Sequence, residues 1–293
     1  MRRSTVLPAL ASALLLGLLG ASTADAVPAP SQTAKAALEC VTSVVGVDSD
    51  KQVRVHTVRN DAVISSRRSA RALPFRVTAW GLFDSEDTKA GFIERLDAVT
   101  TSGKPRRVTL GFKDGSNRIS VKSSRYDQAG FRPRLFADSL GYYAYTVNRA
   151  GKLQRWALTR FRNGDLRFAK KVTIGSGYGD LTALQASMWF KHNGSNREYL
   201  YATTASGALQ QIAVPVKKPT REKRRTLLAS GYAGVTELSW SICNEDTTYT
   251  SLIAVDPAAE VANWTTVKNS VKNPAATLRG EVTGGRWDLS AAF

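Results

Sequence analysis

The chain is poor in the residues that most often carry enzymatic chemistry. Among its 293 residues it has two cysteines, Cys40 and Cys243, and two histidines, His56 and His192. Neither histidine has neighbours at metal-ligand spacing, so the sequence predicts no metal site and no cofactor. No Gly-x-Ser-x-Gly motif occurs, which leaves no nucleophile of the serine-hydrolase type.

Long apolar runs are also scarce. The only one, at residues 6–19, is too short to span a membrane comfortably. Arg2 and Arg3 precede it, and a small-x-small cleavage site follows at residues 24–26. This arrangement predicts a signal peptide over residues 1–26, and therefore a secreted, extracellular protein with no membrane span.

The remainder of the chain is expected to form one domain. Residues 27–36, with two prolines and several small residues, are predicted to be a flexible leader. Residues 37–293 have no long low-complexity stretch, and all-β domains often reach this size.

Acidic residues are outnumbered by basic ones, 24 to 41, which gives a net charge of +17. Six of the nine residues 217–225 are basic, and this run is interpreted either as a solvated loop or as a surface for a polyanion. No helix-turn-helix, zinc finger or RNP-like stretch occurs, so no specific nucleic-acid partner is expected. The candidate polyanion-binding residues are Lys217, Lys218, Arg221, Lys223, Arg224 and Arg225.

A diverged segment recurs about every fifty residues, which is typical of repeat folds such as propellers. Residues 174–184 are followed by 199–209, and residues 229–238 by 251–255. A third copy, 130–136, leads into 142–153, and residues 284–291 resemble the opening of a repeat with no hairpin after it.

Each repeat contains a predicted strand–turn–strand unit, with turn residues between alternating apolar runs. Equivalent positions in these hairpins are Val45, Ala98, Ala144, Ala202 and Ala254. The pattern predicts an all-β, five-bladed β-propeller of four-stranded antiparallel blades. Residues 284–291 form a repeat opening without a hairpin, and residues 40–57 form a hairpin without an opening. Pairing of these N- and C-terminal segments would complete one shared blade and close the propeller.

That closure would bring Cys40, in the shared blade, next to Cys243, in the preceding blade. A secreted chain meets an oxidising compartment, so we expect these two residues to form a disulfide bond. The alternative is two buried free thiols.

The repeat openings resemble the tachylectin-2 family, five-bladed propeller lectins specific for N-acetylglucosamine or N-acetylgalactosamine. The resemblance implies carbohydrate binding between blades, with an aromatic ring against the apolar face of the sugar and a carboxylate on its hydroxyl groups. It covers most of the chain in outline and about half in recognisable motif, and the second blade lacks the glycine signature. The implied sugar-binding residues are Gly177, Tyr178, Asp180, Gly231, Tyr232, Gly130, Phe131, Trp287 and Asp288.

Other interpretations remain open at this point. A glycine followed by an aromatic residue is also typical of a turn that packs one blade on the next. A glycoside hydrolase would need two carboxylates near the central channel, for which Glu237, Asp138 and Asp84 are candidates. A third possibility is a protein-interaction module of a larger secreted complex. The preferred prediction is a non-catalytic protein whose partners are glycans or cell-wall polymers.

Overall fold

The structure is a computed structural model. It describes residues 38–125, 131–138, 143–160, 166–192, 195–243, 249–268 and 271–289. The predicted signal peptide, residues 1–26, and the leader, residues 27–36, lie outside the described residues. The chain from Leu38 onward belongs to one compact unit. Its described part contains no helix long and apolar enough to cross a membrane.

The described part of the unit consists of strands and one short 3₁₀ helix, which confirms the all-β prediction. The strands are β1 (Val41–Val47), β2 (Gln52–Arg59), β3 (Ala62–Ala72), β4 (Val77–Thr88), β5 (Gly91–Thr100), β6 (Pro105–Lys113), β7 (Arg118–Arg125), β8 (Leu135–Asp138), β9 (Tyr143–Val147), β10 (Leu153–Arg160), β11 (Leu166–Gly175), β12 (Leu181–His192), β13 (Ser195–Thr204), β14 (Leu209–Pro215), β15 (Lys223–Leu228), β16 (Glu237–Ile242), β17 (Tyr249–Asp256), β18 (Val261–Lys268) and β19 (Ala275–Glu281). The helix η1 spans Pro219–Arg221.

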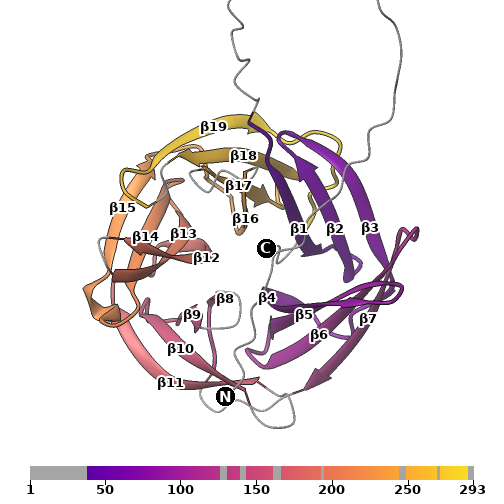
Figure 1. Cartoon of the computed structure of the whole chain (residues 1–293), viewed down its shortest axis with the longest axis horizontal. Coiled ribbons are helices and arrows are strands. Elements are labelled where there is room, and N and C mark those ends of the chain that lie inside the picture. The colour runs from indigo at the N-terminus through magenta and orange to yellow at the C-terminus, as the bar shows by residue number, and fades with distance from the viewer. Residues whose placement is uncertain are drawn as a thin grey trace, which may run out of the picture. The chain divides into compact units, whose positions relative to one another are not determined.

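The strands form sheets in which chain neighbours pair antiparallel. Three sheets have four strands each, β8–β11, β12–β15 and β16–β19, and one has seven, in the order β1-β2-β3-β7-β6-β5-β4. The seven-stranded sheet consists of a three-stranded meander, β1–β3, and a four-stranded one, β4–β7, joined by a short parallel pairing at Arg68 and Ser69 of β3. Figure 1 shows the sheets arranged about a common centre, with β4, β8, β12 and β16 inward and β7, β11, β15 and β19 outward. This arrangement is consistent with a β-propeller.

Two hairpin turns show why glycine recurs in the repeats. Gly151, after β9, and Gly207, after β13, have positive φ angles of 67° and 84°. An added Cβ at Gly151 would lie 2.8 Å from the backbone nitrogen of Gly179, and one at Gly207 would lie 2.9 Å from that of Ala233. Only glycine fits at both positions, because the chain turns into the left-handed region and touches the opening of the next repeat.

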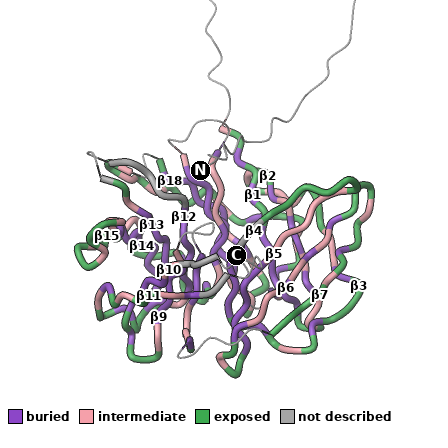
Figure 2. The backbone as a smooth tube through the Cα atoms, turned by 60° about the horizontal axis from the view of Figure 1, so that its bottom comes forward, coloured by how far each residue is buried: buried purple, intermediate pink, exposed green. Residues whose placement is uncertain are grey.

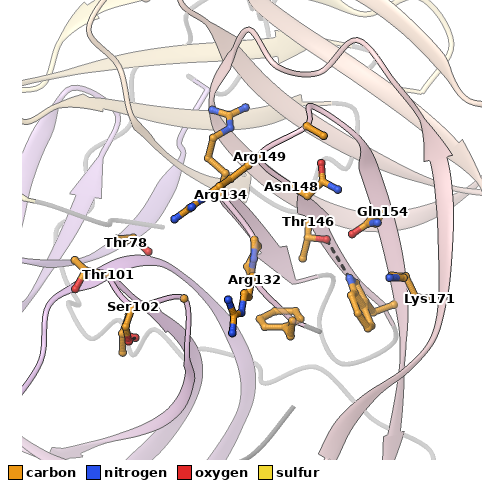
Figure 3. Close-up of a pocket in the computed structure, with 16 residues that line it drawn as sticks. Thr78, Thr101, Ser102, Arg132, Arg134, Thr146, Asn148, Arg149, Gln154 and Lys171 are labelled. Carbon is orange, nitrogen blue, oxygen red and sulfur yellow. Dashed lines mark hydrogen bonds between the residues drawn. The ribbon is translucent and has the colours of Figure 1, made fainter. Parts of the chain in front are cut away.

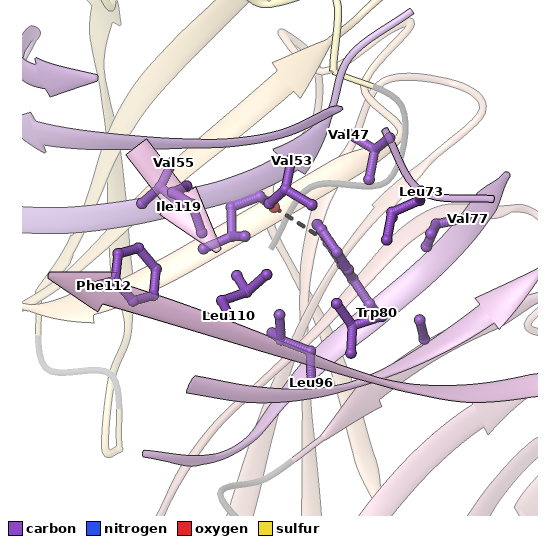
Figure 4. Close-up of a cluster of buried hydrophobic side chains, with 13 residues drawn as sticks. Val47, Val53, Val55, Leu73, Val77, Trp80, Leu96, Leu110, Phe112 and Ile119 are labelled. Atoms are coloured by element: carbon purple, nitrogen blue, oxygen red, sulfur yellow. Dashed lines mark hydrogen bonds between the residues drawn. The ribbon is translucent and has the colours of Figure 1, made fainter. Parts of the chain in front are cut away.

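The middle strands are buried on both faces, since neighbouring sheets cover them from both sides. All of β14 except its last residue is buried, as are the six central residues of β17, and each strand contains a short apolar run, Ile212–Val214 and Leu252–Val255. Figure 4 shows the core between the two halves of the seven-stranded sheet, where the Trp80 indole donates to the Val45 carbonyl at 3.2 Å. Most residues of β15 and about half of those of β3 are exposed to solvent (Figure 2).

The two ends of the described unit lie together. Cys40 and Cys243 form a disulfide bond across 203 residues, which confirms that prediction. Thr283 forms a parallel bridge with Ala62 and accepts a hydrogen bond from the Val63 amide at 3.0 Å. The described part of the predicted terminal repeat, residues 284–289, contains no strand, and its remaining residues lie outside the described part.

Candidate functional site

The four aromatic residues predicted to bind sugar are all buried. The exposed fraction is 3 % for Tyr178, 0 % for Tyr232, and 2 % for both Phe131 and Trp287. Their rings therefore present no free face to a sugar, and this burial argues against the predicted stacking role. The aromatic residue fills the space between neighbouring sheets, which is the packing alternative that the sequence left open.

Hydrogen bonds show how two of these aromatics fasten one sheet to the next. The backbone amides of Tyr178 and Tyr232 each donate at 3.0 Å to the carbonyl of a hairpin glycine in the preceding sheet, Gly151 and Gly207. The Tyr178 hydroxyl donates to Glu222 at 3.0 Å. Burial, followed by the Glu222 carboxylate, raises the pKa of Tyr178 above its ordinary range.

Two residues predicted for different ligands are partners of each other. Arg224, a candidate for polyanion binding, donates to both carboxylate oxygens of Asp180, a candidate for sugar binding, at 3.2 and 3.0 Å. The same guanidinium donates to the Gly177 carbonyl at 2.9 Å and lies 5.3 Å from the centre of the Tyr178 ring. Both charges are thus engaged in holding β15 against the opening of β12.

The rest of the basic run is exposed. Its members are Lys217, Lys218, Arg221, Lys223 and Arg225, on η1, on β15 and just before them. None of these five forms an ion pair with a residue that the structure describes. They form an exposed basic outer edge on this sheet.

The other predicted residues are scattered. Asp288 accepts hydrogen bonds from Arg286 at 2.8 Å and Ser49 at 3.1 Å, and it lines a cavity of about 410 Å³ near the start of β4. Gly231 lies in the turn before Tyr232, with a φ of 103°. Gly130 lies outside the described residues.

A cavity with polar walls lies between the turn after β5 and the sheet β8–β11. Its volume is about 630 Å³. We refer to it as the inter-sheet pocket (Figure 3). One wall consists of hydroxyl-bearing residues and the opposite wall of amide, cationic and aromatic side chains. The lining residues are Thr78, Thr100, Thr101, Ser102, Gly103, Phe131, Arg132, Pro133, Arg134, Thr146, Asn148, Arg149, Ala150, Gln154, Trp156 and Lys171.

Packed aromatic rings hold the apolar side of this pocket. Phe131 stacks on Phe168 with ring centres 4.5 Å apart and meets Trp156 edge to face at 5.6 Å. The Trp156 indole donates to the Thr146 hydroxyl at 3.0 Å, drawn as a dashed line in Figure 3. Lys171 places its ammonium 5.3 Å from the centre of the Trp156 ring. These contacts fix the ring orientations before any ligand arrives.

Arg134 lines the pocket, but its guanidinium is held by backbone carbonyls. Its two terminal nitrogens donate to the backbone carbonyls of Leu181 at 2.7 Å and Tyr178 at 3.1 Å. Burial lowers the pKa of this guanidinium, while Asp180 opposes the shift. The side chain thereby ties the sheet β8–β11 to the start of β12.

Of the residues proposed from sequence that the structure describes, only Phe131 lines the inter-sheet pocket. The other lining residues come from hairpin turns and strand faces that resemble those of other repeats, so no motif marked them. One signal was present in the sequence. Residues 131–134 read Phe-Arg-Pro-Arg, where the opening of β12 reads Tyr-Gly-Asp-Leu at 178–181.

The carboxylates of the hydrolase alternative lie elsewhere. Glu237 begins β16, and Asp138 ends β8 with 5 % exposure. Asp84 lies on β4, but its side chain is outside the described part. None of the three lines the inter-sheet pocket. Among the described residues, no group of three or more histidine, cysteine or acidic side chains could hold a metal ion.

Comparison with known proteins gives matches only among solved structures. No protein-family model matches the chain, and no curated protein does so either. AofleA from Arthrobotrys oligospora is similar over 85 % of this chain and 76 % of its own, with 9 % identity and a TM-score of 0.46. A variant of the Aleuria aurantia lectin, in complex with alpha-methyl-L-fucoside, matches over 85 % and 80 %, with 8 % identity and a TM-score of 0.41. A quinonprotein alcohol dehydrogenase-like protein from Bacteroides thetaiotaomicron matches over 86 % and 57 %, with 11 % identity and a TM-score of 0.34. None of these likenesses assigns a ligand to this chain.

Proposed function

We propose that this protein is a secreted, non-catalytic carbohydrate-binding β-propeller whose inter-sheet pocket binds one sugar unit of a glycan. The observation that carries the proposal is the composition of that pocket. It combines hydroxyl, amide and cationic side chains with a base of packed, buried rings, Phe131 and Trp156, in a volume of about 630 Å³. Pockets of this size and mixed lining are typical of small-ligand sites, and the polar side chains can bond the hydroxyl groups of a pyranose.

The proposed architecture is the five-bladed propeller predicted from the repeats. Four four-stranded meanders and the three-stranded meander β1–β3 support it. The bridge from Thr283 to Ala62 and the disulfide of Cys40 support closure through the chain ends. Secretion rests on the predicted signal peptide, residues 1–26, and the resemblance to the tachylectin-2 family supports an N-acetylated sugar as one ligand class.

The exposed basic edge adds a second element to the proposal. Lys223 and Arg225 on β15, with the neighbouring lysines before η1, would attract an anionic cell-envelope polymer over a wide area. Such attraction is long-ranged and is screened by salt. It would concentrate the protein at the envelope without selecting a particular sugar.

The proposal is tested by substituting pocket residues that are not buried in the core. Ser102→Ala with Gln154→Ala removes two polar groups from opposite walls, and binding to a glycan array and to each responding sugar in solution is then measured. Ser206→Ala is the matched control, because Ser206 and Thr204 form the same hydroxyl pair at 2.9 Å as Ser102 and Thr100, in a turn outside the pocket.

We expect the double variant to weaken sugar binding at least tenfold and the control to leave it unchanged. Binding that survives the double variant would move the site elsewhere. A chain that binds no glycan but captures a defined protein would favour the interaction-module alternative.

A further inference from the structure

We propose that the inter-sheet pocket selects saccharides that carry an acidic group, a carboxylate, a phosphate or a sulfate, through Arg132, Arg149 and Lys171. This inference rests on the proposed function and names the ligand class of the same site. Its basis is the charge of the lining. Four of the 16 lining residues are cationic, and none of them is acidic.

Three of these cationic side chains have no acidic partner in the part of the chain that the structure describes. Arg132, Arg149 and Lys171 form no ion pair with any residue in the described ranges. All three are exposed to solvent, whereas Arg134 is engaged by backbone carbonyls. Cations that share a concave site without counter-charges produce a positive potential there, and this potential attracts an anionic ligand.

The three side chains surround the polar cavity from different elements. Arg132 precedes β8, and its aliphatic stem lies beside Gly103, where an added Cβ would come 3.7 Å from Arg132 Cγ. In Figure 3 Arg132 lies between Thr101 and Ser102 on one side and Thr146 and Gln154 on the other. Arg149 comes from the turn after β9, and Lys171 from β11.

Lys171 is positioned by the aromatic wall. Its ammonium lies 5.3 Å from the centre of the Trp156 ring, a cation–π distance. A sugar near Trp156 would therefore have this charge beside it. Arginine adds a planar fork of donors that matches carboxylate and phosphate oxygens in pairs.

The charge is particular to this junction. The openings at 174–184 and 284–291 carry Asp180 and Asp288, whereas residues 131–134 carry two arginines and no acid. At the junction before β12, the Tyr178 amide donates a hydrogen bond to the Gly151 carbonyl, and Asp180 is paired with Arg224. At the junction where the opening carries two arginines and no acid, the inter-sheet pocket is present instead.

The test compares matched acidic and neutral ligands on the full chain by titration calorimetry at low and high salt. The probes are glucuronate, a glucose phosphate and a glucose sulfate, with glucose and N-acetylglucosamine as the neutral partners. Inorganic phosphate is the control for a bare anion. The variant Arg132→Gln with Arg149→Gln is compared with Lys223→Gln and Arg225→Gln, which removes the same charge from the exposed edge of β15.

We expect at least one acidic sugar to bind tenfold or more tightly than its neutral parent. The carboxylate, phosphate and sulfate probes show which acid is preferred. The pocket variant should abolish that tenfold preference, and the β15 variant should retain it. Inorganic phosphate should bind more weakly than the preferred acidic sugar, because it lacks the groups that meet the hydroxyl and aromatic walls.

Three outcomes would overturn the inference. Equal affinity for neutral and acidic sugars would refute the acidic class and leave carbohydrate binding standing. An equal loss in both charge variants would show general attraction rather than selection by the pocket. Inorganic phosphate bound as tightly as the sugars would make this a simple anion site. A chain that binds none of the sugars would instead refute the proposed function itself.

Discussion

The clearest test of the packing role of the repeat aromatics is the substitution Tyr232→Ala. Tyr232 is fully buried, and its hydroxyl is hydrogen-bonded to that of Thr265 in β18. Truncating a buried aromatic side chain in a core costs about 3–5 kcal/mol of unfolding free energy. Tyr232→Phe keeps the ring and removes only the hydrogen bond, so we expect a loss of about 1 kcal/mol.

The assay is urea unfolding of each variant, followed by tryptophan fluorescence and circular dichroism and extrapolated to zero denaturant. The control is Ile64→Ala, because Ile64 is 49 % exposed and its loss should cost less than about 0.5 kcal/mol. We also expect Tyr232→Phe to bind glycans as the parent does. A Tyr232→Ala variant of unchanged stability that no longer binds sugar would refute the packing role and restore the stacking role.

Further predictions concern charge, pH and the disulfide. The Cys40–Cys243 bond closes a loop of 203 residues, and its reduction should lower the unfolding free energy by about 3–5 kcal/mol. The unfolding free energy is measured with and without reductant, and equal values in the two conditions would contradict this prediction. Burial raises the pKa of Glu94 to about 7 from 4.5, so the folded state binds its proton more tightly than the unfolded state. Stability should therefore fall as the pH rises from about 4.5 to 7, and Glu94→Gln should flatten that slope. Burial lowers the pKa of His56 below 6.5, so stability should decline as the pH drops below that value, and His56→Gln should reduce the decline. Lys223→Gln with Arg225→Gln should weaken salt-sensitive binding to heparin, whereas Arg224→Gln should weaken it less, because Arg224 is already paired with Asp180.

The hairpins could be predicted from sequence because their signals are local. Alternating apolar residues around turn residues mark β9–β10 and β13–β14, and the same pattern marks the hairpins at β1–β2, β5–β6 and β17–β18. Strand pairing across a short turn depends on a few adjacent residues. The disulfide was also predictable, since two cysteines have only one intramolecular pairing and the predicted signal peptide implies an oxidising compartment.

The role of the glycine–aromatic motif could not be predicted in the same way. Its sequence fits both a stacking platform and a packing residue, and the choice depends on whether another sheet covers the ring. The structure covers it, at 0 % exposure for Tyr232 and 3 % for Tyr178. The ion pair of Asp180 and Arg224 could not be predicted from sequence either, because the two residues are 44 positions apart and pair only in the folded chain.

The hairpin strands, their turns and their repetition can be inferred from the amino-acid order alone, because side-chain periodicity and turn chemistry act over a few residues. The place where a ligand could enter depends on the folded chain. The inter-sheet pocket joins Thr78 of β4 to Lys171 of β11, and a cavity between two sheets depends on how their side chains fill the space between them. That packing is a property of distant residues brought together, so no local pattern encodes it.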